Sequence, residues 1–570
     1  MSLSRDEATA RLVGPGLPFE IRELDIRGVR TRVWANAPAS LRDILEASRA
    51  HGERDFIVYE DERLSYAAHY AEVCRLAWVL SEVYGVTPGE RVAIAMRNFP
   101  EWSVAFWAAV AIGAVAVPLN AWWTGAELDY GLGDSGASMA IVDAERLKRI
   151  EGYLTGLSLR GVIVARPGDA LLAAPCEAWA HALDRAPADA ALPAVDIDPE
   201  DDATIFYTSG TTGFPKGALG THRNICANVA TIAFRAALGA LRKDTLPAAL
   251  GGEKVYGAQL LSVPFFHATG CHSVLCPCVM AGNKLVLMHR WNPERALELI
   301  EREQVNSFGG VPGMVWQVLE SPEFARRDTS SVTNIGYGGA PSAPELVRRI
   351  EAQFPQAEPG NGYGLTETSS VTTYNSGADY QARPDSVGQA VPVCAVKVVD
   401  QAGNTVAPGE TGEIWIAGPN VVKGYWNKPE ATAESFSDGW LHSGDLGRMD
   451  EDGFVYVLDR AKDMLIRGGE NVYCVEVEDA LYSHPAVMDA AVIGRPHRVL
   501  GEEVVAVVQL APGREAGEAE LQAHCRDRIA AFKVPVLIDL RREPLPRNAN
   551  GKIVKPQLKD ELFADGAPPA

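Results

Sequence analysis

The sequence predicts an α/β protein of several modules, and three patterns support this fold class. Between residues 64 and 143, apolar-periodic helical segments alternate with short apolar strands, which is typical of a parallel sheet covered by helices on both faces. A second alternating set starts near residue 260 and predicts a second subdomain of the same kind. Residues 385–460 contain short strands with frequent turn residues, which predicts a small antiparallel, barrel-like unit. Strands and helices mix again in residues 461–570, which predicts a separate small α+β domain after a first domain of residues 1–460.

The elements of the first half follow an N-terminal extension, residues 1–60, in which we expect a helix at 40–50 and a strand at 56–59. After the extension, hydrophobic periodicity predicts helices at 67–84 and from 102, and strands at 91–96, 114–120 and 137–143. In the second half the predicted helices are 221–241, 293–304 and 314–320, and the predicted strands are 260–266, 284–288 and 305–312.

One segment, Trp102 to Trp123, is almost wholly apolar and close to the length of a membrane span. Pro100 and Glu101 begin it like the first turn of a helix, Gly113 interrupts it, and the run AVAVPLN that follows is typical of a buried strand. We therefore expect a buried helix and a buried parallel strand rather than a stable insertion in a membrane. Contact with a membrane surface is left open.

Composition narrows the class of protein. Hydrophobic residues make up 47% of the 570 residues and charged residues 22%, as in ordinary soluble globular proteins. The 53 basic and 74 acidic residues give a net charge of -21, which argues against nucleic-acid binding because that requires a basic face. The start, MSLSRDEATA, lacks the apolar region of a secretory signal. Nine scattered cysteines do not suggest a disulfide framework, so we expect a reducing, cytoplasmic setting.

The cluster His267, Cys271, His272, Cys276 and Cys278 invites interpretation as a zinc site. Its irregular spacing and its apolar neighbours favour a buried helix or strand instead.

The segment TIFYTSGTTGFPKG, residues 204–217, predicts a strand that ends in a phosphate-binding loop. Its glycines permit turns that point successive backbone amides one way, its hydroxyl residues add donors, and its lysine adds a positive charge. The spacing is not that of a Walker A loop, which needs GxxxxGK[ST], and a flexible polar linker is the alternative. The residues that we expect to hold a nucleotide polyphosphate are Thr208, Ser209, Gly210, Thr211, Thr212, Gly213 and Lys216.

The same run resembles the signature of the adenylate-forming, or AMP-binding, family, which includes acyl-CoA synthetases, adenylation domains of peptide synthetases and luciferases. Four further stretches match the family pattern in the order that it requires: IGYGGAPSAP, NGYGLTET, the run from GWLHSGDLG to NVYCVEVE, and LPRNANGKIVK. The resemblance covers roughly residues 40–562. It implies that the C-terminal domain is mobile relative to the large N-terminal domain.

The resemblance assigns two stretches to the adenine of ATP. In IGYGGAPSAP, Gly339, Ala340 and Pro341 would let the backbone approach the adenine edge closely. In NGYGLTET, Tyr363 would stack on adenine and Gly364 would adjoin it. Taken alone, either stretch could be a plain structural turn.

The resemblance also implies the catalytic residues. Thr366 would donate to the α-phosphate, and Glu367 would coordinate Mg²⁺, with Thr208 as a further metal-site residue. Lys552 would reach across the domain gap to bridge the substrate carboxylate and the α-phosphate, stabilising the negative charge that builds there. His267, in FFHATG, matches an aromatic gate at the carboxylate pocket. A solvated lysine and a core histidine are the structural alternatives.

The long third stretch carries the ribose and coenzyme A assignments. Asp445 would accept both ribose hydroxyls, and Arg460 would add a cationic fork near ribose and phosphate. Lys462 matches the hinge between the two domains. Gly468 and Gly469 would line a passage for the pantetheine arm of coenzyme A, where a side chain would block it.

Two residues depart from the family pattern. Cys474 stands where many relatives have proline, and His497 replaces a frequent aspartate. Both are expected near the coenzyme A face, so the contacts to coenzyme A are less well defined than those to ATP.

The combined motifs predict an ATP-dependent, Mg²⁺-requiring acyl-CoA ligase that forms an acyl-adenylate and then a thioester. The run VNSFGGVPGMVW, residues 305–316, would line the acyl pocket, and its small residues Gly309, Gly310 and Gly313 suggest a roomy or elongated cavity. A medium- or long-chain fatty acid is the expected substrate, with a bulky cyclic or aromatic acid as the alternative. Loading of a carrier protein, a luciferase-like oxygenase, a non-catalytic nucleotide-binding scaffold and a homodimer are left open.

Overall fold

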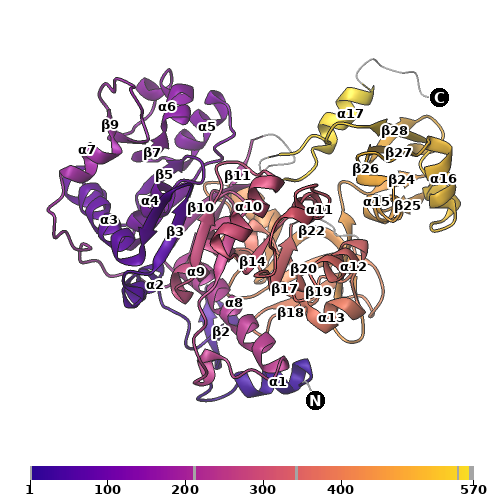
Figure 1. Cartoon of the computed structure of the whole chain (residues 1–570), viewed down its shortest axis with the longest axis horizontal. Helices are drawn as coiled ribbons and strands as arrows, with labels where there is room; N and C mark the ends of the chain where they lie inside the picture. The colour runs from indigo at the N-terminus through magenta and orange to yellow at the C-terminus, as the bar shows by residue number, and fades with distance from the viewer. Residues whose placement is uncertain (1–2, 209–213, 340–343, 549–550, 564–570) are drawn as a thin grey trace.

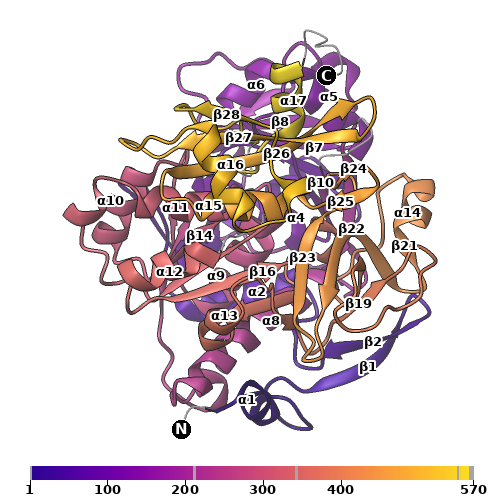
Figure 2. The same ribbon diagram turned by 90° about the vertical axis from the view of Figure 1, so that its right-hand side faces the viewer.

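The computed structural model describes residues 3–208, 214–339, 344–548 and 551–563, and Figures 1 and 2 show their arrangement from two sides. These residues form five β-sheets, two of them large. The last strands and helices make a separate lobe, drawn in yellow at the upper right of Figure 1. The predicted class is confirmed: two α/β subdomains, a small antiparallel unit and an α+β C-terminal region.

The first large sheet has the strand order β11-β10-β6-β5-β7-β8-β9. Strands β5 to β10 run parallel, because a helical or looped crossover follows each of them, whereas β11 forms an antiparallel hairpin with β10. The strands are β5 (Arg91–Ala95), β6 (Val115–Pro118), β7 (Met139–Asp143), β8 (Gly161–Ala165), β9 (Cys176–Ala178), β10 (Asp202–Thr208) and β11 (Lys216–Thr221). Their helices are α3 (Tyr66–Trp78), α4 (Pro100–Ala111), α5 (Gly125–Ser135), α6 (Ala144–Ile150) and α7 (Trp179–Asp184).

The second large sheet has the order β18-β17-β16-β15-β14-β12-β13-β3-β4. It takes β3 and β4 from near the N-terminal extension, so the two halves interlock instead of following one another along the chain. The strands are β3 (Asp55–Tyr59), β4 (Glu62–Ser65), β12 (Ala258–Leu261), β13 (Lys284–Leu287), β14 (Ser307–Gly310), β15 (Asn334–Gly338), β16 (Glu358–Tyr363), β17 (Thr373–Ser376) and β18 (Gln389–Ala390). The helices beside it are α2 (Leu41–Ser48), α8 (His222–Arg242), α9 (Cys276–Ala281), α10 (Pro293–Glu303), α11 (Pro312–Leu319), α12 (Pro344–Gln353) and α13 (Gly377–Ala382).

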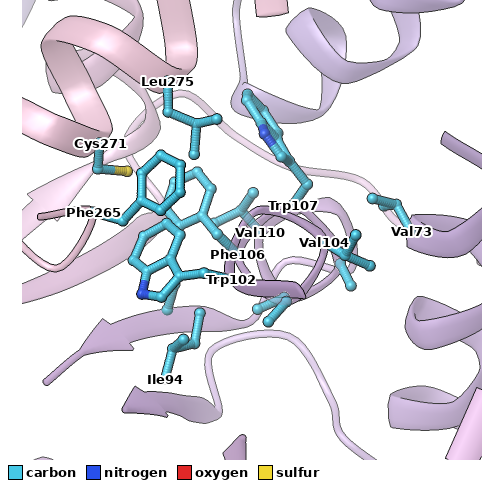
Figure 3. Close-up of a cluster of buried hydrophobic side chains, with 14 of the residues drawn as sticks. Val73, Ile94, Trp102, Val104, Phe106, Trp107, Val110, Phe265, Cys271 and Leu275 are labelled. Carbon is cyan, nitrogen blue, oxygen red and sulfur yellow. The ribbon is translucent and has the colours of Figure 1, made fainter. Parts of the chain in front are cut away.

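Helix α4 is the shared core of the two halves. All of its residues except Glu101 are buried, and the Trp102 ring stacks on Phe265 of the second half at 4.9 Å between centroids. Figure 3 shows Trp102, Phe106 and Phe265 gathered around this helix. A helix that is apolar on every side is buried in protein or lipid, and here protein covers it. The prediction of a buried helix followed by a buried strand is therefore confirmed.

Helix α8 is the one helix in the described part of the chain that is long and apolar enough to cross a membrane. Its Phe234 and Leu238 pack with Ala8 and Leu12 of α1 (Arg5–Leu12). About two thirds of its apolar stretch, 67%, is buried inside the protein, as expected of a core helix.

Three smaller units complete the fold. The predicted barrel-like unit is an antiparallel sheet of β19 (Ala395–Val399), β20 (Gly412–Ala417), β21 (Phe436–Ser437), β22 (Trp440–Met449) and β23 (Val455–Arg460), with α14 (Pro429–Ser435) beside it. The C-terminal lobe holds β24 (Leu465–Arg467), β25 (Glu470–Val472), β26 (Val487–His497), β27 (Gly501–Leu510) and β28 (Leu537–Arg541) with α15 (Cys474–Tyr482), α16 (Glu518–Arg526) and α17 (Lys555–Phe563). A hairpin of β1 (Ile21–Ile26) and β2 (Val29–Trp34) follows α1.

Candidate active site

One cavity of about 2490 Å³ lies where both large sheets, the barrel-like unit and the C-terminal lobe meet. It collects residues that are hundreds of positions apart in the chain. The predicted site residues that line it are Thr208, Lys216, His267, Gly339, Tyr363, Gly364, Thr366, Glu367, Asp445, Arg460, Lys462 and Lys552.

Other predicted residues are not placed in the cavity. Gly468 and Gly469 form the two-residue turn of the β24-β25 hairpin, where both have a positive φ, and neither lines the cavity. The remaining predicted residues, Ser209, Gly210, Thr211, Thr212, Gly213, Ala340 and Pro341, lie outside the described residues.

The β10-β11 hairpin positions the two described ends of the phosphate loop. Thr208 pairs with Lys216 in the ladder, and the Thr208 hydroxyl donates to the Lys216 carbonyl at 3.3 Å. The Lys216 ammonium lies 5.0 Å from the ring centre of Tyr425, whose hydroxyl donates to a carboxylate oxygen of Glu367 at 2.8 Å. Tyr425 therefore joins the phosphate loop to the carboxylate turn. Tyr425 was not predicted from the sequence, although the aromatic pair Tyr425–Trp426 in a glycine-containing connector could have indicated it.

Thr366 and Glu367 sit on a short 3₁₀ turn, Thr366–Thr368, that is tightly constrained. A side chain on Gly364 would lie 1.5 Å from the Ser370 carbonyl oxygen, so only glycine fits there. Ser369 and Ser370 both have a positive φ, at 51° and 111°, which is unfavourable for residues with side chains. Strain of this kind persists only where the surrounding structure enforces it, and it is concentrated at functional sites.

Asp445 has both carboxylate oxygens engaged by the protein. The Tyr363 hydroxyl donates to one at 2.7 Å, and Arg460 Nε lies 2.7 Å from the other. Burial raises the pKa of Asp445, while Arg460 and the Tyr363 hydrogen bond oppose the rise. A carboxylate has about four lone-pair directions, so Asp445 can still accept from a ligand hydroxyl.

Lys552 reaches the cavity from the C-terminal region. Its backbone amide donates to the Asn548 side chain at 3.1 Å, which fixes the turn that carries it. A side chain on Gly339 would lie 3.8 Å from Lys552 Cε, so this lysine approaches the end of β15. Burial lowers the pKa of Lys552 to about 8; Arg460 lowers it further, and Asp445 and Glu367 oppose this.

His267 is half-buried beside Lys552. Burial lowers the pKa of its imidazole to about 3, and the Lys552 charge contributes to this decrease. A neutral imidazole next to an ammonium group can pack against a carboxylate substrate without adding a second charge. His267 begins the cysteine-rich segment, which is helical and mostly buried, as predicted. The described residues contain no group of three or more His, Cys, Asp or Glu side chains that could hold a metal.

The two departures from the family pattern have local structural roles. The buried Cys474 begins α15; its amide donates to Asp459 at 2.6 Å and its thiol to the Asp463 carbonyl at 3.1 Å. His497 accepts the amides of Val499 and Leu500 through Nδ1 and so closes the β26-β27 turn.

The fold and the cavity place residues of both large sheets, the barrel-like unit and the C-terminal lobe in one site. A family model described as AMP-binding enzyme matches residues 44–426, and one described as AMP-binding enzyme C-terminal domain matches 476–552, so the chain belongs to the AMP-binding enzyme family. The resemblance inferred from the sequence motifs is confirmed.

Named relatives cover nearly the whole chain. A feruloyl-CoA synthase from Amycolatopsis sp is 36% identical over 499 residues, 87% of this chain and 93% of that protein. A long-chain-fatty-acid–CoA ligase from Bacillus subtilis (strain 168) is 34% identical over 549 residues, which cover 92% of this chain and 94% of that protein. The crystal structure of the anthranilate CoA ligase AuaEII in complex with anthranoyl-AMP aligns with a TM-score of 0.83 at 26% identity. The alignment covers 94% of this chain and 99% of that chain. The protein is thus an AMP-forming acid–thiol ligase that uses ATP, coenzyme A and a carboxylic acid.

The Lys552 pKa leads to a pH prediction. A lysine is positive only below its pKa, so we expect kcat/KM for ATP in pyrophosphate exchange to fall as pH rises through about 8. Lys552→Arg, which stays charged, should lose this decrease even if its overall rate is lower. A wild-type profile that is flat across this range would contradict the assignment of charge to Lys552.

Proposed function

We propose that the arrangement described is the one for adenylation: the acid carboxylate attacks the α-phosphorus of ATP and pyrophosphate leaves, with Lys552 stabilising the developing charge. The observation that supports this most directly is the position of Lys552, in one cavity with His267, Glu367 and Asp445. The remaining family roles follow: Lys216 and the loop hydroxyls for the β- and γ-phosphates, Thr366 for the α-phosphate, Gly339, Tyr363 and Gly364 for adenine, and Asp445 with Arg460 for ribose.

Glu367 and Thr208 suit a magnesium ion that is shared with the nucleotide. Mg²⁺ is a hard cation that usually takes one or two carboxylates plus substrate phosphates and waters, so one protein carboxylate is sufficient. Glu367 supplies that carboxylate, and Tyr425 holds one of its oxygens in place. The bound ion would supply charge neutralisation at the phosphates.

Thioester formation is proposed to need a different position of the C-terminal residues, 461–570, relative to 1–460, with rotation about Lys462. Lys462 is exposed in the turn after β23. The β24-β25 turn is suited to a close approach by the pantetheine arm, because a side chain on Gly469 would meet nothing within 4 Å. Moving Lys552 out as this turn moves in would separate the two half-reactions.

We propose that the acid is a medium- or long-chain fatty acid. The cavity continues from His267 along one face of α8, with Val229, Ile232, Ala233 and Ala236 in its wall. The lining positions on α8 and just after it run from 229 to 243, about 21 Å at the rise of an α-helix. The relative named as a long-chain-fatty-acid–CoA ligase is consistent with this choice.

A cyclic or aromatic acid is the second candidate. Gly309 and Gly336 line the cavity on neighbouring strands, where a side chain on Gly309 would lie 1.5 Å from the Gly336 carbonyl, so the sheet surface is flat there. The relatives named for feruloyl-CoA and anthranilate favour this candidate. Gly313, expected to widen the acyl pocket, lines the cavity and also makes room for Arg547, because a side chain on it would lie 3.1 Å from that guanidinium.

A cytoplasmic location is consistent with the nine cysteines, all free and eight of them buried. No feature of the described residues supports the homodimer or the membrane-surface contact that the sequence left open.

Removal of the Lys552 side chain separates the half-reactions. Lys552→Ala should lose adenylation by about two orders of magnitude or more, the size of one transition-state charge contact, and should keep thioester formation from supplied acyl-adenylate. Pyrophosphate exchange and direct thioester assays measure the two steps. Equal loss of both would contradict the proposed division.

The role of Glu367 is tested through the magnesium requirement. Glu367→Gln keeps the shape and the Tyr425 contact and removes the charge, so we expect a higher Mg²⁺ concentration at half-maximal activity. Glu413→Gln, a change at another cavity carboxylate, is the control. An unchanged magnesium dependence in Glu367→Gln would remove its assigned role.

Substrate choice is tested by pyrophosphate exchange across a panel of fatty, cyclic and aromatic acids, with mass detection of the CoA thioesters. We expect the highest kcat/KM with medium- or long-chain acids because the cavity follows α8. A preference for ring-bearing acids would establish the second candidate, and thioester formation only on a carrier protein would contradict coenzyme A as acceptor.

A further inference from the structure

Arg235 lies in the wall of the elongated part of the cavity and has no role in the reaction so far described. It lies on α8, seven residues beyond Asn228, whose side chain donates to the His272 carbonyl at 2.8 Å and so marks the end of the helix near the catalytic residues. Seven residues of α-helix rise about 10 Å. Arg235 is therefore well away from the carboxylate end of the acyl channel.

The Arg235 guanidinium stacks on an aromatic ring at the sheet surface. Its central carbon lies 2.9 Å from the ring centre of Tyr374 on β17. The Tyr374 side chain lies over the neighbouring strand β16, where glycine leaves room for it. A side chain on Gly360 would lie 2.1 Å from the Tyr374 hydroxyl oxygen. The arginine is thus held between α8 and the sheet, with its planar fork oriented by the ring.

Arg235 forms no ion pair with a carboxylate among the described residues, and the charge of Glu358 acts on it only from beyond ion-pair distance. Its Nε is buried without a hydrogen-bond partner, and burial lowers its pKa. The nearby cations differ in this respect, because Arg242 pairs with Asp379 at 2.7 Å and Lys243 pairs with Glu358 at 2.5 Å. Arg235 is half-buried, and a partly desolvated charge without an ion-pair partner is costly, so its presence calls for an explanation.

A second cavity, of about 320 Å³, adjoins the channel at this point and shares Arg235 and Tyr374 with it. Arg5 also lines it and donates to the Tyr374 carbonyl at 3.4 Å, and no carboxylate in the described part of the chain pairs with Arg5. Four cations, Arg5, Arg235, Arg242 and Lys243, and one carboxylate, Glu358, therefore line this cavity, in a chain whose net charge is -21. This local excess of positive charge is suited to an anion.

Building on the proposed function, we infer that the acyl channel accepts acids with a second carboxylate at the distal end, which Arg235 binds with the support of Arg5. A guanidinium fork binds a carboxylate through two parallel hydrogen bonds, and the bound carboxylate would supply the missing negative charge. A purely aliphatic tail would leave Arg235 both desolvated and unpaired. Arg235 would then determine specificity without contact to the reacting atoms.

The test compares matched acids on one protein preparation. Octanoic, decanoic and dodecanoic acids are paired with octanedioic, decanedioic and dodecanedioic acids, and kcat/KM is measured by pyrophosphate exchange. We expect wild type to favour at least one diacid over its monoacid, and Arg235→Met to reduce that ratio by about tenfold or more. Arg235→Lys keeps the charge but lacks the planar fork, so its diacid-to-monoacid ratio of kcat/KM should lie between those of wild type and Arg235→Met. The ratio does not depend on the folded fraction, so a purely structural effect of the substitution would leave it unchanged.

Arg448→Met is the matched control. Arg448 also stacks on a tyrosine, 3.8 Å from the ring centre of Tyr456, but does not line the cavity, so its removal should leave the ratio unchanged. A wild-type preference for every monoacid, or the same ratio in Arg235→Met, would overturn the inference while the fatty-acid proposal stands. If no aliphatic acid of either kind reacts and a ring-bearing acid does, both proposals fail.

Discussion

The electrostatic environment of Lys552 is the constraint on which the rest of the site depends. Its half-buried ammonium group is close to a second cation, Arg460, and the carboxylates of Asp445 and Glu367 offset part of the cost of the charge. The result is a lysine whose pKa, about 8, lies close to neutral pH. Arrival of a triphosphate would add the missing negative charge and favour the protonated form. The charges around Lys552 are therefore suited to a nucleotide.

That environment exists only while the C-terminal loop is seated on the N-terminal part of the chain. A side chain on Gly551 would lie 2.8 Å from Val311, and one on Gly313 would lie 3.1 Å from Arg547, so small residues on both sides permit the contact. The ion pair of Arg547 with Asp489 holds the loop to its own lobe. Seating the loop and completing the charge cluster are thus one event, so the proposed lobe movement would switch the chemistry.

The distribution of charge explains how a strongly acidic chain can use anionic substrates. The cations Lys216, Arg235, Arg460 and Lys552 all line the central cavity, despite the net charge of -21. Salt screens exposed charges beyond about 8 Å, so the enclosed cations act on a ligand more strongly than the distant acidic surface does. Because carboxylates line the cavity as well, anionic groups are expected to bind at these individual cations and not through a net positive charge of the whole cavity.

The sequence by itself determined the α/β class, the antiparallel unit at 385–460 and the motifs of the nucleotide site, because hydrophobic period and turn residues are local properties. It did not indicate that Thr208 and Lys216 pair in one hairpin, because only the strand before the loop was predicted. Tertiary structure alone decided the rest. Whether Lys552 comes near Asp445 depends on how the C-terminal lobe sits on the rest of the chain. Tyr425 bonds to Glu367, 58 positions away, and Arg235 of helix α8 stacks on Tyr374 of strand β17. Contacts between distant segments are set by packing, which no local pattern encodes.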